Sequence, residues 1–448
     1  MIIKINAQLE QAIREIKELG ALEGEPQWAT DLRLSGLVSA RTLPLPSRQD
    51  ENWRRARPEI FLPDRQEPCA LRGESLTLNL FPESSPQAEE ALEGFSGLAG
   101  LKIPIQGEWD LNSQIFRQGG LLVGSLPLLF KEQPDLEKSI FKAEHPRRFL
   151  SSALISALRR GGVSLYAPAG VCAPQTLKIN HQVEPRPDTE GSEQNLFCNH
   201  SLFKAEAQAQ VNVVEIFQSP PETLQVLSFI EFELGRGAQV NYVLVSDWSQ
   251  ATTCLTTVHA RLAADSSLKV VLVDTHSGAT KTFFNEDLNG PNAKTEIYGL
   301  VFAKDGRRSE VNTFVHHQAP HTYSNVLVNC ALGGDRARTL FAGNILVDPQ
   351  AQQTDAYQKN QNLILSPGAR AESMPKLEII ADDVRCTHGA SFTNYDADQL
   401  FYLQSRGLSE VDAKRLLISG FFQEILAQVE DPTLLAWLSN FTQEEFTL

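Results

Sequence analysis

The sequence predicts a mostly-β protein with a right-handed parallel β-helix (a solenoid) as its core and helical domains at both ends. From Val163 to about residue 390 the chain is a series of closely spaced strand-like runs rich in β-branched residues, such as QVNVVEIF and SLKVVLVDTH. No helical pattern separates these runs, which disfavours a fold of alternating strands and helices. Similar breaks, such as LGRGAQV and LGGDRARTL, recur at multiples of roughly one 20–30-residue coil, the scale of a solenoid. A β-sandwich is the alternative, and the scarcity of hairpin dipeptides argues against it.

The first of three expected domains, 1–145, combines helical and irregular segments. It opens with an amphipathic helix in which four apolar residues share one face: Leu9, Ile13, Ile16 and Leu19. Proline- and charge-rich stretches follow, such as RTLPLPSRQDENWRRARPEIFLPDRQEP. Because proline interrupts both helices and sheets, these stretches predict short helices, loops and isolated strands.

The second expected domain, 146–393, contains the β-helix, and a short helix in HPRRFLSSALISALRRGG leads into it. The third, 394–448, is helical. Asp396 stands three residues before a glutamine, which is the spacing of a capping box, and the glycine of LQSRG fits the position that ends the helix. Ser409 can cap a second helix, and Asp431, followed by a proline, begins a third.

The second C-terminal helix carries an apolar stripe that is too large for short helices to hide among themselves. Its members are Leu417, Ile418, Phe421, Phe422, Ile425 and Val429. Such a stripe either folds back on the solenoid or docks a partner. The pattern alone leaves both alternatives open.

The stretch DDVRCTHGAS contains the strongest candidate for chemistry. Cys386 and His388 lie two residues apart, so on a strand both side chains leave the same face. Thiolate and imidazole together suit zinc, copper or iron. Two ligands are too few to hold an ion, and further ligands would come from elsewhere in the chain or from another subunit. The alternative is a buried strand cysteine beside a hydrogen-bonded histidine.

Two further clusters are weaker candidates. The stretch VHHQAPH supplies His316, His317 and His321, but neighbouring strand residues point to opposite faces, so the first two cannot bind one ion together. Asp382 and Asp383 suggest a β-helix glycosidase, which needs two carboxylates flanking its substrate. Neighbouring aspartates on a strand diverge, which makes this a remote alternative.

Composition narrows the classes of partner. With 40 basic and 55 acidic residues the net charge is −15, a field that repels nucleic acid and anionic membranes. No apolar run reaches the roughly 18 residues that span a bilayer, and the charged first segment lacks the pattern of a secretory signal. We therefore expect a cytoplasmic protein. The six cysteines are scattered without a C-x-x-C pair, which predicts reduced thiols. No P-loop is present, so the chain itself is not expected to hydrolyse ATP.

Three stretches carry a family resemblance: ENWRR, FLSSALISALRRGGVSLYAPAGV, and the segment Asp382–Leu426 from DDVRCTHGAS to GFFQEIL. Through them the sequence resembles the SufD-like subunits of the SufBCD iron–sulfur cluster assembly complex. The resemblance implies a parallel β-helix that pairs with a SufB-like paralogue, C-terminal helices that dock a SufC-like ATPase, and a possible homodimer of the isolated chain. Cys386 and His388 match positions at the SufB–SufD interface. The docking region matches the stripe residues Leu417, Ile418, Phe421, Phe422 and Ile425.

One departure distinguishes the chain from SufB-like proteins. These carry a cluster-related cysteine in a strand of the pattern Y-x-Q-C-D, whereas here the comparable stretch is AYQKNQNLIL, with Gln361 at or beside that position. SufB-like chains also usually have a His-Glu-Ala sequence in place of Cys-x-His-Gly. Both differences favour a SufD-like subunit that cannot build a cluster unaided.

The sequence therefore predicts a non-catalytic scaffold subunit that holds no cofactor alone. A transient iron–sulfur cluster is expected at the heterodimer interface, with ligands from both subunits. The alternative from another class is a purely architectural adaptor, in which the SufB-like subunit supplies all ligands. No motif marks a flavin site.

Overall fold

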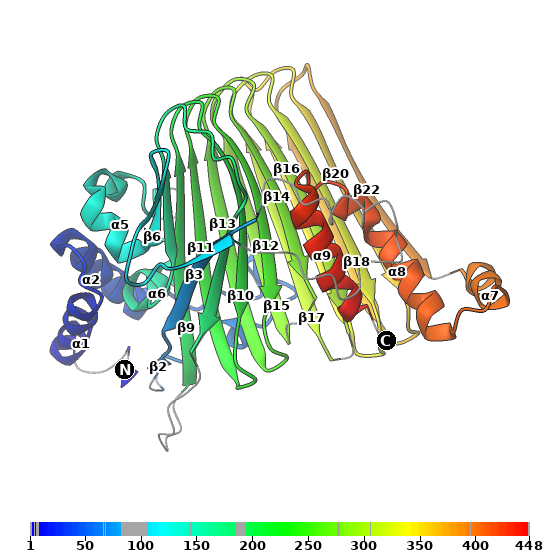
Figure 1. Cartoon of the computed structure of the whole chain (residues 1–448), viewed down its shortest axis with the longest axis horizontal. Coiled ribbons are helices and arrows are strands. Elements are labelled where there is room, and N and C mark those ends of the chain that lie inside the picture. Colours follow the sequence, from blue (N-terminus) through cyan, green and yellow to red (C-terminus); the bar gives the residue numbers. More distant parts are fainter. Residues whose placement is uncertain are drawn as a thin grey trace.

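Two long sheets stacked face to face form the body of the protein (Figure 1). The computed structural model describes residues 2–3, 5, 9–65, 67, 69–81, 106–142, 146–184, 194–275, 278–304, 306–394 and 396–446. Within the solenoid, successive strands alternate between the sheets and pair in parallel with the strand one coil away. The prediction of a mostly-β parallel β-helix with helical regions at both ends is confirmed.

The first sheet is called sheet A, and the described part of it has 12 strands. Its strands are β1 (Ile2–Ile3), β2 (Cys69–Leu71), β5 (Phe116–Gln118), β6 (Leu121–Ser125), β7 (Val163–Ala167), β9 (Gln194–Ala205), β11 (Leu224–Leu234), β13 (Thr252–Leu262), β15 (Ala279–Leu288), β17 (Arg308–His317), β19 (Arg338–Val347) and β21 (Arg370–Ile379).

The second sheet, sheet B, has 10 strands among the described residues. They are β3 (Glu74–Leu80), β4 (Gln106–Asp110), β8 (Leu177–Val183), β10 (Gln210–Gln218), β12 (Gln239–Asp247), β14 (Ser267–Asp274), β16 (Lys294–Ala303), β18 (Tyr323–Leu332), β20 (Asp355–Ile364) and β22 (Arg385–Asn394).

Alternation along each strand builds the core. In β12, Val240, Tyr242 and Leu244 belong to the cluster between the sheets, while Val243 and Val245 belong to a second cluster on the outer face of sheet B. Both faces of these strands are covered, which is why their sequences are nearly continuous apolar runs.

The N-terminal region covers the outer face of sheet A (Figure 1). Its helices are α1 (Leu9–Leu22), α2 (Gln27–Thr42), α3 (Pro58–Phe61), α5 (Leu126–Glu132) and α6 (Leu150–Leu158), with 3₁₀ turns η1 (Glu51–Trp53) and η2 (Pro134–Lys138). On α1, Ile16 and Leu19 are buried as predicted, whereas Leu9 in the first turn is exposed.

The sequence predicted isolated strands in the N-terminal region, and this prediction is wrong. The strands of this region join the two sheets. Strand β3 pairs antiparallel with β8, and β6 pairs antiparallel with β7. These strands satisfy the backbone groups at the first coil of the solenoid, which would otherwise form open sheet edges.

A buried ionic cluster joins β3 to the solenoid. The His181 ring lies between two carboxylates: Nδ1 is 2.7 Å from Glu74 Oε2 and Nε2 is 2.6 Å from Glu215 Oε1. Burial opposes protonation of the ring, but the two carboxylates outweigh this effect and raise the pKa of His181 to about 10. Tyr242 donates a further hydrogen bond of 2.5 Å to Glu215. The cluster therefore holds a protonated histidine in the core.

The C-terminal helices begin where the sequence predicts. They are α7 (Ala397–Ser405), α8 (Glu410–Leu426) and α9 (Pro432–Glu445). The side chains of Asp396, Ser409 and Asp431 each accept hydrogen bonds from backbone N–H groups of the first turn. Gly407 has a φ of +95°, the left-handed conformation expected after a helix end. Helices α8 and α9 lie on the outer face of sheet B (Figure 1).

No helix in the described part of the chain combines the length and apolar character that crossing a membrane requires.

Candidate functional site at the open end of the β-helix

The two ends of the solenoid differ. At the first coil, strands and helices of the N-terminal region extend and cover the sheets. At the last coil, β21 ends sheet A and β22 ends sheet B, and no described strand pairs with their outer edges. We call this end the open end. Unpaired edges are templates for pairing with another chain, and native proteins normally protect them.

Cys386 and His388 lie on β22 at this open end. In the register of the sheet, Cys386 stands opposite Ala356 of β20, and His388 stands opposite Gln358. Both β20 residues are buried between the sheets. Cys386 and His388 therefore continue the inward-facing row by one more strand, and they share a face as the sequence predicts. Since no described coil follows, Cys386 is only partly buried and His388 is exposed.

The surroundings of the Cys386 thiol are mostly apolar. It contacts a small cluster at the last coil that includes Val347, Ala356 and Ala381. Burial, followed by the nearby carboxylate of Asp355, raises the pKa of this thiol above its ordinary value. In the isolated chain the sulfur is therefore a protonated thiol at neutral pH, and its use as a ligand requires a change in its surroundings, such as a bound cation.

Exposed apolar side chains lie on the last strands, some on the same face as this pair and others on the outer faces of the two sheets. Phe392 follows His388 on β22 in the same inward-facing row, since the residue opposite it on β20 is buried. The full set of exposed large apolar residues at the last coils is Tyr357, Met374, Ile379, Ile380 and Phe392. Apolar groups gathered beside two unpaired sheet edges are typical of a surface that another protein covers.

The donor set is incomplete within the chain. Among the described residues, no group of three or more His, Cys, Asp or Glu side chains could hold a metal ion. Farther along β20, opposite the residues that follow the pair on β22, the side chains are amides: Asn360 and Asn362 are buried, and Gln361 is partly buried between them. No thiol from β20 supplements Cys386 here, in agreement with the departure from the SufB-like pattern.

The three histidines of the VHHQAPH stretch have separate environments. On β17, His317 is buried and its ring nitrogens lie 2.8 and 2.9 Å from the hydroxyls of Thr322 and Ser324. Burial lowers its pKa to about 3, so the ring is neutral. His316 points to the opposite face, with Nε2 3.0 Å from a carboxylate oxygen of Asp348. His321 lies in an exposed turn with a φ of +60°. The structure does not bring the three rings together.

The two neighbouring aspartates lie in the turn between β21 and β22. Asp382 and Asp383 are both exposed. The backbone N–H of Asp383 donates to the side chain of Gln352 over 2.9 Å, so the segment is held by its main chain rather than by its carboxylates.

The predicted docking stripe on α8 is largely covered by the chain itself. Ile418, Phe422 and Ile425 are fully buried against the outer face of sheet B, while Leu417 and Phe421 are partly buried. The exposed apolar residues of the C-terminal region are instead Phe401 and Tyr402 on α7, Leu408 before α8, and Val411 and Leu416 on α8. Helix α7 has no buried residue and projects away from the sheets (Figure 1). Sequence periodicity could not separate these two sets, because both lie on apolar helix positions.

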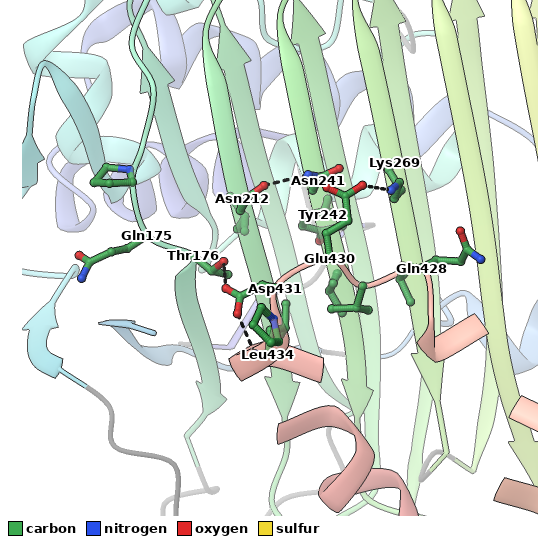
Figure 2. A pocket seen from close by; sticks show the side chains of 16 residues that line it. Gln175, Thr176, Asn212, Asn241, Tyr242, Lys269, Gln428, Glu430, Asp431 and Leu434 are labelled. Carbon is green, nitrogen blue, oxygen red and sulfur yellow. Dashed lines mark hydrogen bonds and ion pairs between the residues drawn. The ribbon is translucent and has the colours of Figure 1, made fainter. Parts of the chain in front are cut away.

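A cavity of about 240 Å³ lies where the turn between α8 and α9 crosses sheet B (Figure 2). On its floor, the side-chain amide of Asn241 donates to Asn212 over 2.9 Å. Lys269, from the next strand, forms an ion pair with Glu430 of the turn. Asp431 accepts a hydrogen bond from a threonine hydroxyl and also caps α9. The charged groups of this cavity therefore fasten the C-terminal helices to the solenoid.

The ENWRR segment binds the N-terminal region to the last coils. Trp53 is buried beside Phe283, with ring centroids 6.4 Å apart, and the Lys281 ammonium lies 5.2 Å from the Trp53 ring centroid. The Arg55 guanidinium lies 3.5 Å from the carboxylate of Glu372 on β21. The N-terminal region thus reaches the last described strand of sheet A.

A parallel β-helix with one open end, apolar residues around it and an incomplete pair of soft donors is typical of a subunit that assembles with another chain. Residues 188–421 match the family model described as SUF system FeS cluster assembly, SufBD core domain. The chain belongs to the SufBD family of iron–sulfur cluster assembly proteins.

Curated relatives agree with this family. A SufBD family protein of Mycobacterium leprae is 36% identical over 226 residues, 49% of this chain and 58% of that protein. The chloroplastic protein ABCI7 of Arabidopsis thaliana is 26% identical over 264 residues, 58% of this chain and 56% of that protein. A SufBD family protein of Staphylococcus haemolyticus is 23% identical over 425 residues, 91% of this chain and 87% of that protein. The first two matches span less than two thirds of the relative's own length.

Proposed function

We propose that this chain is a SufD-type, non-catalytic scaffold subunit that pairs through its open end with a SufB-like paralogue. The observation that carries the proposal is the position of Cys386 and His388. Both lie in the inward-facing row of the solenoid, yet at the last coil they remain accessible. A second β-helix that adds strands to β21 and β22 would cover them and supply the missing ligands.

In this proposal the iron–sulfur cluster is cargo of the assembled complex. The thiol of Cys386 and the imidazole of His388 contribute two donors, and the SufB-like subunit contributes the others. The same open end would account for a homodimer of the isolated chain, because it is the part of the described structure that combines unpaired edges with exposed apolar residues.

The proposed surface for a SufC-like ATPase is the exposed part of the C-terminal helices. Ile418, Phe422 and Ile425 anchor α8 to sheet B, so they transmit a force rather than contact the partner directly. Phe401 of α7 and Leu416 of α8 are among the exposed apolar groups of this region. An ATP-driven movement of the partner would pull on α7, which directly follows β22 and its donor pair.

The test is cluster assembly by the reconstituted complex with SufB-like and SufC-like partners. We expect His388→Asn and Cys386→Ala each to reduce cluster formation by about tenfold or more, the scale of losing a ligand. His321→Asn is the matched control, because His321 is exposed in the turn between β17 and β18, outside the last coil, and asparagine tolerates its positive φ. Unchanged cluster formation in both variants would contradict the proposal.

One observation favours the architectural adaptor as second candidate. The Cys386 side chain packs against an apolar cluster, and this burial raises the pKa of its thiol and disfavours the thiolate that a metal requires. If this chain only positions its paralogue, the heterodimer of the Cys386→Ala, His388→Asn double variant should bind iron as wild type does. Iron binding by that heterodimer should then depend on residues of the SufB-like subunit alone.

A further inference from the structure

Four arginines gather on the outer face of sheet A, away from the thiol and imidazole. The side chains of Arg55, Arg308, Arg338 and Arg370 line one hollow of about 30 Å³. Three come from the solenoid, and Arg55 comes from the ENWRR segment that lies over the sheet. Such a concentration of positive charge is unexpected in a chain of net charge −15.

The sheet register forces these like charges together. Arg308, Arg338 and Arg370 begin three successive strands of sheet A and stand directly opposite one another. Neighbouring strands are about 4.8 Å apart, and like charges directly opposite each other in a sheet are destabilising. The arrangement therefore has a cost that carboxylates or a bound anion must offset.

The carboxylates of the hollow offset only part of this charge. Glu310 is shared, since its oxygens lie 2.5 Å from Arg308 Nε and 2.7 Å from Lys281 Nζ. Glu372 lies 3.5 Å from Arg55 in a half-exposed pair, which contributes little. Two carboxylates thus face five cations, the four arginines and Lys281.

The remaining two arginines have no acidic partner in the described part of the chain. Arg338 Nη1 donates to three backbone carbonyls, those of Asp335, Ala337 and Gly368, at 2.7 to 3.1 Å. These bonds hold the guanidinium in place while its charge stays uncompensated. The Arg370 side chain is exposed and makes no described ion pair. One arginine is thus held in place by backbone carbonyls, whereas the other is exposed.

We propose that this hollow binds a phosphate-type oxoanion. Guanidinium groups match phosphate with paired N–H donors in a fixed fork, and a dianion relieves the mutual repulsion of the arginines better than a single carboxylate does. The small size of the hollow disfavours an extended acidic segment. The source is inorganic phosphate or the phosphoryl group of a small molecule. This inference is independent of the proposed scaffold function.

The test is calorimetric titration of the full-length chain with inorganic phosphate at constant ionic strength, with chloride replaced as phosphate is added. We expect one site, and an affinity about tenfold lower in Arg370→Ala, because a charged hydrogen-bonding pair is lost. Arg370 is exposed, so its truncation should not affect folding. Arg55→Ala, from the other wall of the hollow, should weaken binding in the same direction. Arg236→Ala is the control, since Arg236 is an exposed arginine paired with Asp265.

Further titrations separate the sources. Phosphoserine or ADP binding more tightly than inorganic phosphate would assign the site to a phosphorylated small molecule, and the reverse order would assign it to the free ion. Equal phosphate affinity in wild type and Arg370→Ala, or the absence of phosphate binding to wild type, would overturn the inference.

Discussion

His388 stands directly opposite Gln358 in the register of β22 and β20, yet the two side chains have opposite environments. Gln358 is fully buried and donates a hydrogen bond of 2.8 Å to the carbonyl of Lys376. His388 occupies the equivalent position one strand later and is exposed. The difference arises because no described strand follows β22 in sheet B. A partner that adds a coil there would bury His388 as Gln358 is buried now.

Thiol labelling should distinguish the open end from the rest of the chain. Of the six cysteines, Cys172 is exposed and Cys386 partly buried, while the other four are buried. We expect iodoacetamide to modify Cys172 and Cys386 only. Because only the thiolate reacts and the pKa of Cys386 is raised, the labelling rate of Cys386 should keep increasing as the pH rises above neutral. Asp355→Asn should speed the reaction of Cys386 by removing a nearby negative charge. Mass spectrometry of the labelled peptides measures both rates.

A SufB-like partner should protect Cys386 and not Cys172 in the same labelling experiment. Cys172 is the internal control, because it lies outside the last coil. Equal labelling of Cys386 in the free chain and in the heterodimer would show that the open end stays uncovered.

A charge at the open end should weaken pairing without unfolding the chain. Phe392 is 51% exposed on β22, so Phe392→Lys should leave the melting temperature nearly unchanged. Burying the new ammonium in an interface is costly, and we expect association with a SufB-like partner to weaken by about tenfold or more. Analytical ultracentrifugation of the mixed subunits measures this. Leu22→Lys, at an exposed residue of α1, is the control and should pair normally.

The buried side of α8 should matter for stability. Phe422 is fully buried, and its ring stacks on Phe446 at a centroid distance of 5.1 Å. We expect Phe422→Ala to lower the free energy of unfolding by about 3–5 kcal/mol, as for other large core truncations. Phe401→Ala, at a residue that is 71% exposed, should change it by less than about 0.5 kcal/mol. Urea unfolding of the isolated chain checks both values, and equal effects would contradict the packing of α8 on sheet B.

The His181 cluster should make stability depend on pH. Because the pKa of His181 is raised to about 10 in the folded chain, its contribution is fully present below the unfolded value of about 6.5 and is lost as pH rises toward 10. Relative to wild type, His181→Gln should therefore lose on the order of a few kcal/mol near pH 6 and much less near pH 9.5. Unfolding free energies at the two pH values test this. For His321→Asn, the difference in unfolding free energy from wild type should be the same at both pH values.

Local features were predictable from the sequence. The caps at Asp396, Ser409 and Asp431 are decided by contacts within three residues, and each forms as expected. The shared face of Cys386 and His388 follows from the two-residue period of a strand. The parallel β-helix itself could be predicted because its strands are continuous apolar runs without helices between them.

Contacts between distant residues were not predictable in the same way. The Glu74–His181 pair joins residues 107 positions apart, and Glu430 reaches Lys269 across 161 positions. The stripe on α8 has the same apolar period whether it covers the chain's own sheet or a partner. Its burial against the outer face of sheet B depends on where the preceding strand ends and on the contacts that hold the turn between α8 and α9.

The sequence by itself determined the strand-rich core, the helix boundaries and the two soft donors on one strand face, because each depends on residues that are neighbours along the chain. Only the tertiary structure decided that these donors lie at an open end, that Phe422 faces inward, and that four arginines share one hollow. These outcomes depend on register between coils and on which surfaces remain uncovered, and both are set by contacts between residues far apart in the sequence.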